Sequence, residues 1–141
     1  MYKRQSERTA PEVRATGGSL FGLQTWVALP TAHEETAPGF AHHRAEEIPA
    51  TEGDGVRLTL IAGTSDGLVS PVKTFSDMVY ADIVLAEGAR YRLKAEHVER
   101  AVYVVQGAFE VEGQAGTFAA DEFVIFEPGA EAVLRLSLIH I

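Results

Sequence analysis

The sequence predicts an all-β domain, a sandwich or a barrel built from short strands. Hydrophobic residues make up 46% of the 141-residue chain, which is enough to form a packed core. Several apolar runs alternate with polar residues at a period of two, as half-buried strands do. Glycine and proline interrupt these runs at regular spacing, and no long amphipathic helical pattern is present. Evenly spaced short strands are typical of sandwiches and barrels.

The first forty residues contain one predicted strand. Residues 6–18 are polar and are expected to form a loop. Residues 20–29 alternate between apolar and polar side chains and end before Pro30, which predicts a strand. This run holds Trp26, the only tryptophan, and we expect its side chain to anchor a face of the core. Residues 31–38 are expected to form a loop with room for one helical turn.

The middle of the chain contains two further predicted strands. Residues 40–48 fit either a strand or a short connector, and residues 51–55 are expected to turn because of their glycine and aspartate content. Residues 56–63 alternate and end at a glycine, which predicts a strand. A loop rich in glycine, serine and aspartate is expected over residues 64–71, and residues 78–85 then alternate again as a strand.

The last third of the chain contains five short predicted strands. Residues 91–93 form the first of them. Residues 101–105 are continuously β-prone, so both faces of that strand are expected to be buried. Residues 109–112 place phenylalanine and valine on one face and two glutamates on the other. Residues 122–126 and 132–135 complete the series, separated by a Pro-Gly pair.

The composition of the chain excludes several classes of function. There is no cysteine, so disulfides, thiolate metal sites and cysteine nucleophiles are excluded. The formal net charge is −8 and no run of lysine or arginine is present, which disfavours direct nucleic-acid binding. No apolar run approaches membrane-spanning length, and none follows the first residues as in a signal peptide. We therefore expect a cytoplasmic protein that does not bind membranes.

The two ends of the chain look foreign to the rest of the sequence. Residues 136–141 match one reading frame of a common sequencing-library adapter, and residues 2–5 match its other strand. Two such matches, in the expected orientations, favour an adapter over a natural charged start and a natural final strand. We therefore expect residues 1–5 and 136–141 to be adapter residues, and the rest to be an internal piece of a longer protein.

Two segments have the residue spacing of the paired motifs of a cupin, which is a small jelly-roll barrel. The first segment runs from Gly88 through His97 and Glu99 to a strand that ends at Gly107, and the second covers residues 121–129. In a cupin the two motifs occupy neighbouring strands, so their side chains converge inside the barrel. If His97 and Glu99 lie on a strand, they share one of its faces.

Six segments have a distinctive order and spacing: residues 6–8, 22–30, 46–49, 56–63, 70–72 and 80–89. Through them the chain resembles, from residue 6 to about residue 135, the pirin family, whose members are two cupin barrels in tandem. The resemblance implies an all-β tandem bicupin, truncated at both ends. It implies that residues 6–62 are the C-terminal remainder of the first, metal-binding cupin domain with a connector. Residues 63–135 would then be an incomplete second cupin domain.

The resemblance also implies an iron site in the first barrel, built from three histidines and one glutamate. Glu7 matches that glutamate by position and is our one candidate metal ligand. The histidine two residues earlier is replaced by Gln5, and the other two would lie before Met1. Imidazole and carboxylate ligands suit non-haem iron, because they leave open positions for oxygen or substrate. Since one glutamate alone binds metal weakly, this chain as written is not expected to hold the iron.

The other candidate residues have simpler explanations. His97 and Glu99 are expected to be a loop or barrel-mouth pair, because the resemblance implies a metal-free second barrel. In a strand, the adjacent His42 and His43 would point to opposite faces, so a joint metal site is not expected. No base partner is evident for Ser19 or Ser70. We expect solvated charges or polar groups at His33, Glu34, Glu35, Glu46 and Glu47, and core positions for Trp26, Phe40, Phe75 and Phe126.

The resemblance leaves two functions open for the longer protein. One is an iron-dependent quercetin 2,3-dioxygenase acting on a small flavonol-like aromatic substrate, with Glu7 helping to orient or deprotonate a substrate hydroxyl. The other is a non-enzymatic, redox-sensitive transcriptional co-regulator that binds a protein partner, and the net negative charge fits a basic one. The fragment itself is expected to be inactive. It could also be an incomplete β-assembly, whose unpaired strand edges favour aggregation.

Overall fold

The computed structural model describes residues 9–19 and 21–136, and the chain divides into two units. Residues 1–41 form the first unit and residues 42–141 the second. Every strand that the structure describes belongs to the second unit, so the all-β prediction is confirmed there. None of the helices in the described part of the chain is both long and apolar enough to cross a membrane.

Two short helices lie in the first unit. Helix α1 (Pro11–Thr16) begins with a proline, whose missing N–H costs nothing at a helix start, and is followed by Gly17 at φ +68°. The expectation of a loop over residues 6–18 is therefore wrong over these six residues. The 3₁₀ helix η1 (Thr31–His33) forms the single helical turn that the predicted loop over residues 31–38 allowed.

The strand predicted over residues 20–29 is wrong for its described residues 21–29, which belong to no strand. A strand exists only where a neighbouring strand takes up its backbone hydrogen bonds, and none of the described strands pairs with these residues. Trp26 is 88% exposed and Phe40 is 79% exposed. The expectation that these two aromatic side chains lie in a core is therefore also wrong.

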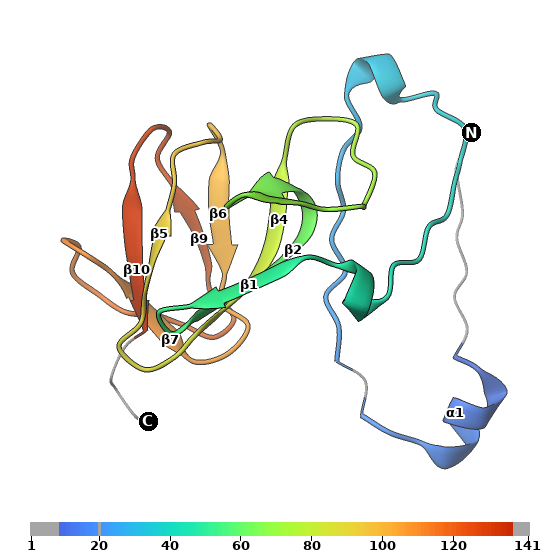
Figure 1. The fold of residues 1–141 in the computed structure, drawn as a ribbon, viewed down its shortest axis with the longest axis horizontal. Coiled ribbons are helices and arrows are strands. Elements are labelled where there is room, and N and C mark those ends of the chain that lie inside the picture. The colour runs from blue at the N-terminus through green and yellow to red at the C-terminus, as the bar shows by residue number, and fades with distance from the viewer. Residues whose placement is uncertain (1–8, 20, 137–141) are drawn as a thin grey trace. The chain divides into compact units, whose positions relative to one another are not determined.

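The first sheet of the second unit is built around one long strand (Figure 1). Strand β2 (Val56–Ser65) pairs antiparallel with β1 (Ala50–Gly53), β3 (Leu68–Val69) and β4 (Val79–Leu85). The 3₁₀ helix η2 (Ala45–Glu47) precedes it, so residues 40–48 form the connector rather than the strand. The alternation that predicted β2 and β4 also appears as alternating burial along β2.

The second sheet has four strands in the order β5–β10–β7–β8, and each pair of neighbours is antiparallel. Its members are β5 (Arg90–Leu93), β7 (Ala108–Val111), β8 (Phe118–Ala119) and β10 (Ala132–Leu136). Strand β10 reaches the centre of this sheet from the end of the chain. The short strands β1, β3 and β8 were not expected, because two to four residues carry too little alternation to be recognised.

A two-stranded ribbon of β6 (Arg100–Tyr103) and β9 (Phe123–Phe126) completes the second unit. One face of this ribbon packs on a core that it shares with the second sheet. Phe126 lies in that core as predicted, Phe109 lies there too, and Phe75 is half-buried. The buried members of the core cluster are Val104, Phe109, Val111, Phe126, Ala132 and Leu134.

The expectation that both faces of residues 101–105 are buried is wrong. Val104 is only 6% exposed, but Tyr103 and Val105 on the other face are 42% and 39% exposed. Only one face of the β6–β9 ribbon packs on the core, so a continuous apolar run here does not mean burial on both sides. The predicted boundary between residues 62 and 63 falls within β2, and the assignment of the earlier residues to a first cupin domain stays a prediction.

Candidate functional site

The residues with metal-ligand chemistry are scattered in the structure. Glu7, our candidate ligand, lies outside the described residues. His97 is half-buried and Glu99 exposed, and both lie in the loop between β5 and β6 rather than on a strand. Within residues 9–19 and 21–136, no three histidine, aspartate or glutamate side chains come together as a metal would require.

The remaining sequence candidates have local structural roles. The imidazole Nδ1 of His43 lies 3.3 Å from a carboxylate oxygen of Glu47, one turn along the connector. His42, His33 and the glutamates at positions 34, 35 and 46 are exposed, as expected. The hydroxyl of Ser70 donates to the carbonyl of Ile61 at 2.7 Å and accepts from the backbone N–H of residue 72 at 3.2 Å. This serine therefore stabilises the chain near β3 and is not a nucleophile.

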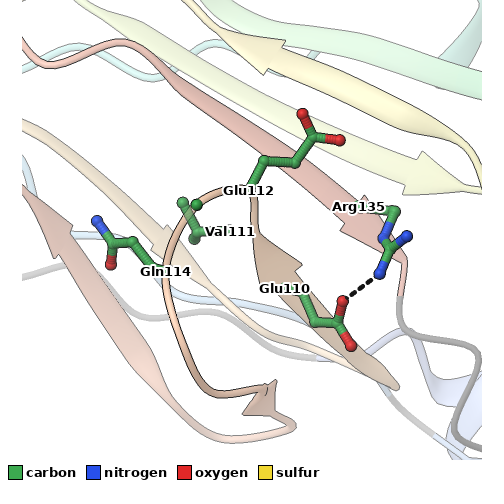
Figure 2. Close-up of a pocket in the computed structure, with 6 residues that line it drawn as sticks. Glu110, Val111, Glu112, Gln114 and Arg135 are labelled. Carbon is green, nitrogen blue, oxygen red and sulfur yellow. Dashed lines mark hydrogen bonds and ion pairs between the residues drawn. The ribbon is translucent and has the colours of Figure 1, made fainter.

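A hollow of about 300 Å³ lies where β7 meets β10 (Figure 2). Figure 2 shows the side chains of Glu110 and Arg135 pointing toward one another, and Nη2 of the arginine lies 2.5 Å from Oε2 of the glutamate. Glu112, also in the lining, accepts a hydrogen bond from Arg90. Both carboxylates of the hollow are therefore neutralised by arginines, and its lining includes no histidine. The hollow is poorly suited to a metal ion.

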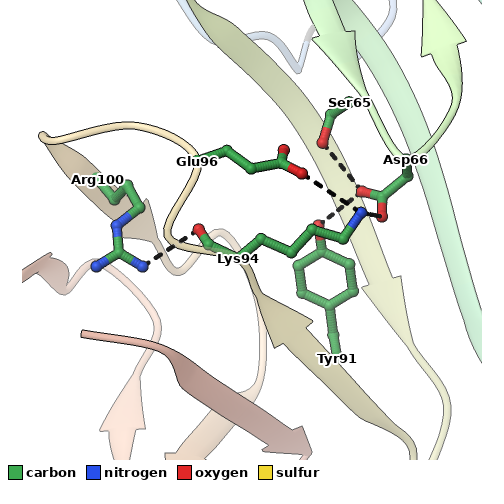
Figure 3. A network of polar contacts seen from close by, with 6 residues as sticks. All are labelled: Ser65, Asp66, Tyr91, Lys94, Glu96 and Arg100. Atoms are coloured by element: carbon green, nitrogen blue, oxygen red, sulfur yellow. Dashed lines mark hydrogen bonds and ion pairs between the residues drawn. The ribbon is translucent and has the colours of Figure 1, made fainter. Parts of the chain in front are cut away.

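A network of polar side chains centred on Asp66 joins the turn after β2 to the end of β5 (Figure 3). Asp66 sits in this turn with φ +50°, a conformation that aspartate tolerates better than most residues. The ammonium of Lys94 lies 2.7 Å from its Oδ1. The hydroxyls of Ser65 and Tyr91 donate to its Oδ2 at 3.0 and 3.2 Å. A carboxylate oxygen of Glu96 lies 3.7 Å from the same ammonium.

The pKa values of three groups in this network, Asp66, Tyr91 and Lys94, are shifted further away from neutral pH. Burial raises the pKa of Asp66, but hydrogen bonds from Lys94 and Ser65 outweigh it and hold the pKa below the ordinary 3.8. Burial, followed by the charge of Asp66, raises the pKa of Tyr91. The hydrogen bond to Asp66 raises the pKa of Lys94. None of these groups is therefore poised to exchange a proton near pH 7, as a general acid or base should be.

Arg100 is a buried cation beside this network (Figure 3). Its Nη1 donates to the carbonyls of Leu93 and Lys94 at 3.5 and 3.2 Å. Its Nη2 donates to the carbonyl of Glu127 at 2.8 Å and to that of Ala130. The side chain thus ties the loop after β5 to the loop after β9 through backbone atoms. Its role is structural, because all four partners are carbonyls of the fold.

The sequence could have located one part of this arrangement. Asp66 and Gly67 form an Asp-Gly pair between two β-prone runs, which is a strong signal for a tight hairpin turn. Nothing in the sequence marks Lys94 or Tyr91 as its partners, since they are 25 or more residues away. Arg100 carries no signal of burial either, because its partners are backbone carbonyls from two separate loops.

The second half of the chain matches a family of known structure. A family model described as the pirin C-terminal cupin domain matches residues 80–140. A pirin-like protein of Caulobacter vibrioides is 40% identical over 124 residues, which cover 87% of this chain and 42% of that protein. A Pseudomonas aeruginosa protein named as a candidate quercetin 2,3-dioxygenase is 30% identical over 134 residues, 94% of this chain and 40% of its own.

The fold has a counterpart among solved structures. The crystal structure of a quercetin 2,3-dioxygenase from Acinetobacter baumannii superposes with a TM-score of 0.68 at 26% identity. The superposed region covers 79% of this chain and 36% of that one. The chain therefore spans about two fifths of the length of these two relatives, and 36% of the Acinetobacter chain.

Proposed function

The chain belongs to the pirin family and has the cupin fold, and from this premise we propose that it is part of an iron-dependent quercetin 2,3-dioxygenase. Its substrate would be a small, flavonol-like aromatic molecule. The observation that carries the proposal is the similarity, in sequence and in fold, to proteins bearing that name. Because the chain spans only part of these relatives, the activity is proposed for the whole protein.

The described residues do not themselves fit an iron site. No cluster of three metal-ligating side chains forms among residues 9–19 and 21–136, and His97 and Glu99 lie in a loop. The core between the second sheet and the β6–β9 ribbon is filled by apolar side chains. We therefore assign no catalytic step to these residues, which serve as a scaffold. The ligand that we propose within this chain is Glu7, which lies outside the described residues and would act with histidines of the whole protein.

The test compares two glutamate variants of the whole, iron-loaded protein. Oxygen uptake with quercetin should be lost in Glu7→Ala, together with bound iron measured by atomic emission. Glu99→Ala, which removes an exposed loop carboxylate, should retain both. The 141-residue chain alone should bind no stoichiometric iron. Quercetin-dependent uptake by the unmodified protein no greater than that of Glu7→Ala would refute the dioxygenase proposal.

A second candidate function is a redox-sensitive transcriptional co-regulator that binds a protein partner. The net charge of −8 favours it, since an acidic surface attracts a basic protein more readily than nucleic acid. In this case the oxidation state of the iron would alter the surface that the partner contacts. The measurement is the affinity of the partner for the ferrous and the ferric whole protein. Equal affinities would argue against regulation by redox state.

A further inference from the structure

The outward face of the β6–β9 ribbon is apolar. The register pairs Ala101 with Ile125 and Tyr103 with Phe123, and all four side chains point away from the core. Backbone hydrogen bonds between Val104 and residues 121 and 122 continue the pairing, which brings Val105 onto the same face. Phe123 is 64% exposed and Ile125 75% exposed. We call these five residues the ribbon face: Ala101, Tyr103, Val105, Phe123 and Ile125.

Carboxylates stand at both ends of the ribbon face. Glu99 and Glu127 continue the outward-facing positions of β6 and β9 beyond one end, and both are exposed. At the other end Asp121 accepts a hydrogen bond from the hydroxyl of Tyr103 at 2.9 Å. Arg100 is the only basic residue within 99–105 and 121–127, and it is buried against backbone carbonyls. An apolar centre is thus bounded by negative charge without a neighbouring cation on either strand.

We propose that the ribbon face binds a segment of a partner protein that presents a short apolar run flanked by lysine or arginine. Apolar side chains of the partner would cover Phe123 and Ile125, which otherwise remain in water. The flanking cations would lie against Glu99 and Glu127 at one end and Asp121 at the other. Such charge complementarity gives specificity and raises the association rate, while the apolar centre supplies most of the binding energy.

The same charges argue against two other occupants of an apolar face. A second copy of the chain would bring like carboxylates together, at a net charge of −8 on each molecule. The surface of an anionic membrane would be repelled for the same reason. This binding surface involves no residue proposed for the iron chemistry and does not depend on the dioxygenase activity.

The experiment uses the whole protein and two labelled peptides with the same central run of leucine and valine. One peptide carries two lysines at each end and the other carries two glutamates. Fluorescence anisotropy should show binding of the lysine peptide and at least tenfold weaker binding of the glutamate peptide. Salt should weaken the lysine complex, because exposed charges are screened within about 10 Å at 0.1 M. Equal binding of the two peptides would overturn the proposal, and so would the absence of binding by both, since another part of the protein would then cover the ribbon face.

Paired variants separate the ribbon face from apolar surface in general. Phe123→Ser with Ile125→Ser should weaken the lysine peptide at least tenfold. Val69→Ser with Val84→Ser, which removes 70% and 55% exposed valines of the first sheet, should leave binding unchanged. Glu99→Gln with Glu127→Gln should remove most of the salt dependence. Sedimentation showing a dimer that the Phe123 and Ile125 changes dissociate would also overturn the proposal, since a second copy would then cover the face.

Discussion

The ammonium of Lys94 lies 2.7 Å from a carboxylate oxygen of Asp66, and this ion pair links the two larger sheets of the second unit. Asp66 lies in the turn that follows β2 of the first sheet, and Lys94 directly follows β5 of the second. The carboxylate is 22% exposed, so it is better shielded than the carboxylate of a typical surface pair. It also accepts the hydroxyls of Ser65 and Tyr91.

Replacing Asp66 with asparagine should destabilise the chain by about 1–2 kcal/mol, because charge-assisted hydrogen bonds are lost while the turn is kept. Asparagine tolerates a positive φ as aspartate does, so the backbone is not strained. The matched control is Asp54→Asn, since Asp54 has φ +51° in another turn and is exposed. The control should cost less than about 0.5 kcal/mol in urea unfolding. Equal losses in the two variants would show that the network contributes nothing.

The contribution of Asp66 should disappear in acid. Its pKa is lower in the folded chain than the ordinary 3.8, so the folded state holds the charged form more strongly than the unfolded state does. The stabilisation is then complete above the unfolded value and is lost as pH falls through the folded value. The difference in unfolding free energy between the unmodified chain and Asp66→Asn should therefore shrink from pH 7 to about pH 2. A difference that stays constant with pH would contradict this assignment.

The sequence predicts the strands of the second unit well because alternation is a local property. The predicted strand 56–63 lies within β2, and the predicted strand 78–85 covers β4. The phenylalanine and valine of residues 109–112, which share one face, are buried in the core. The same alternation fails at residues 21–29, because pairing depends on a second strand that local sequence does not supply. Trp26 is consequently exposed, although its segment carries the family resemblance.

The site was harder to predict than the fold. The resemblance identifies Glu7 from its position, and that residue lies outside the described structure. The network around Asp66 depends on contacts between residues 25 to 28 positions apart, and Arg100 depends on carbonyls of two loops. Such contacts follow from how strands stack, which no local pattern reports. His97 and Glu99, which were expected to be a loop or barrel-mouth pair, do lie in a loop.

Arg100 should be among the least replaceable side chains in the second unit. Arg100→Met keeps most of the volume but removes four hydrogen bonds to backbone carbonyls, and each lost charge-assisted bond costs about 1 kcal/mol or more. Arg100→Lys keeps the charge but lacks the planar fork that reaches carbonyls of two loops, so it should also lose stability. We expect a loss of about 3 kcal/mol for methionine and somewhat less for lysine, measured by urea unfolding.

The control for Arg100 is Arg92→Lys on β5. Arg92 is 67% exposed and its guanidinium lies 3.3 Å from the exposed carboxylate of Glu131, so this change should cost less than about 0.5 kcal/mol. Comparable losses for the two arginines would mean that the four carbonyls are hydrated equally well without Arg100.

Gly63 is required by the close approach of β4 to β2. Its φ is +88°, and a Cβ at this position would lie 1.7 Å from the carbonyl oxygen of Met78. The register between the two strands shifts just before it, between Leu60 and Ala62, so an irregular backbone brings this carbonyl near. Gly63→Ala would therefore force the strands apart as well as strain the backbone. We expect a loss of more than about 3 kcal/mol, or failure to fold.

Gly107→Ala separates the steric clash expected at Gly63 from the backbone strain of a positive φ. Gly107 has φ +78°, but a Cβ there would meet nothing within 4 Å, so only the backbone penalty of about 1–2 kcal/mol applies. Urea unfolding of the two variants should differ by at least about 1.5 kcal/mol, with the Gly63 variant less stable. If Gly63→Ala gives no soluble folded protein while Gly107→Ala folds cooperatively, the steric requirement is supported. Equal losses would show that β4 can move away from β2 without cost, and that positive φ alone explains the glycine.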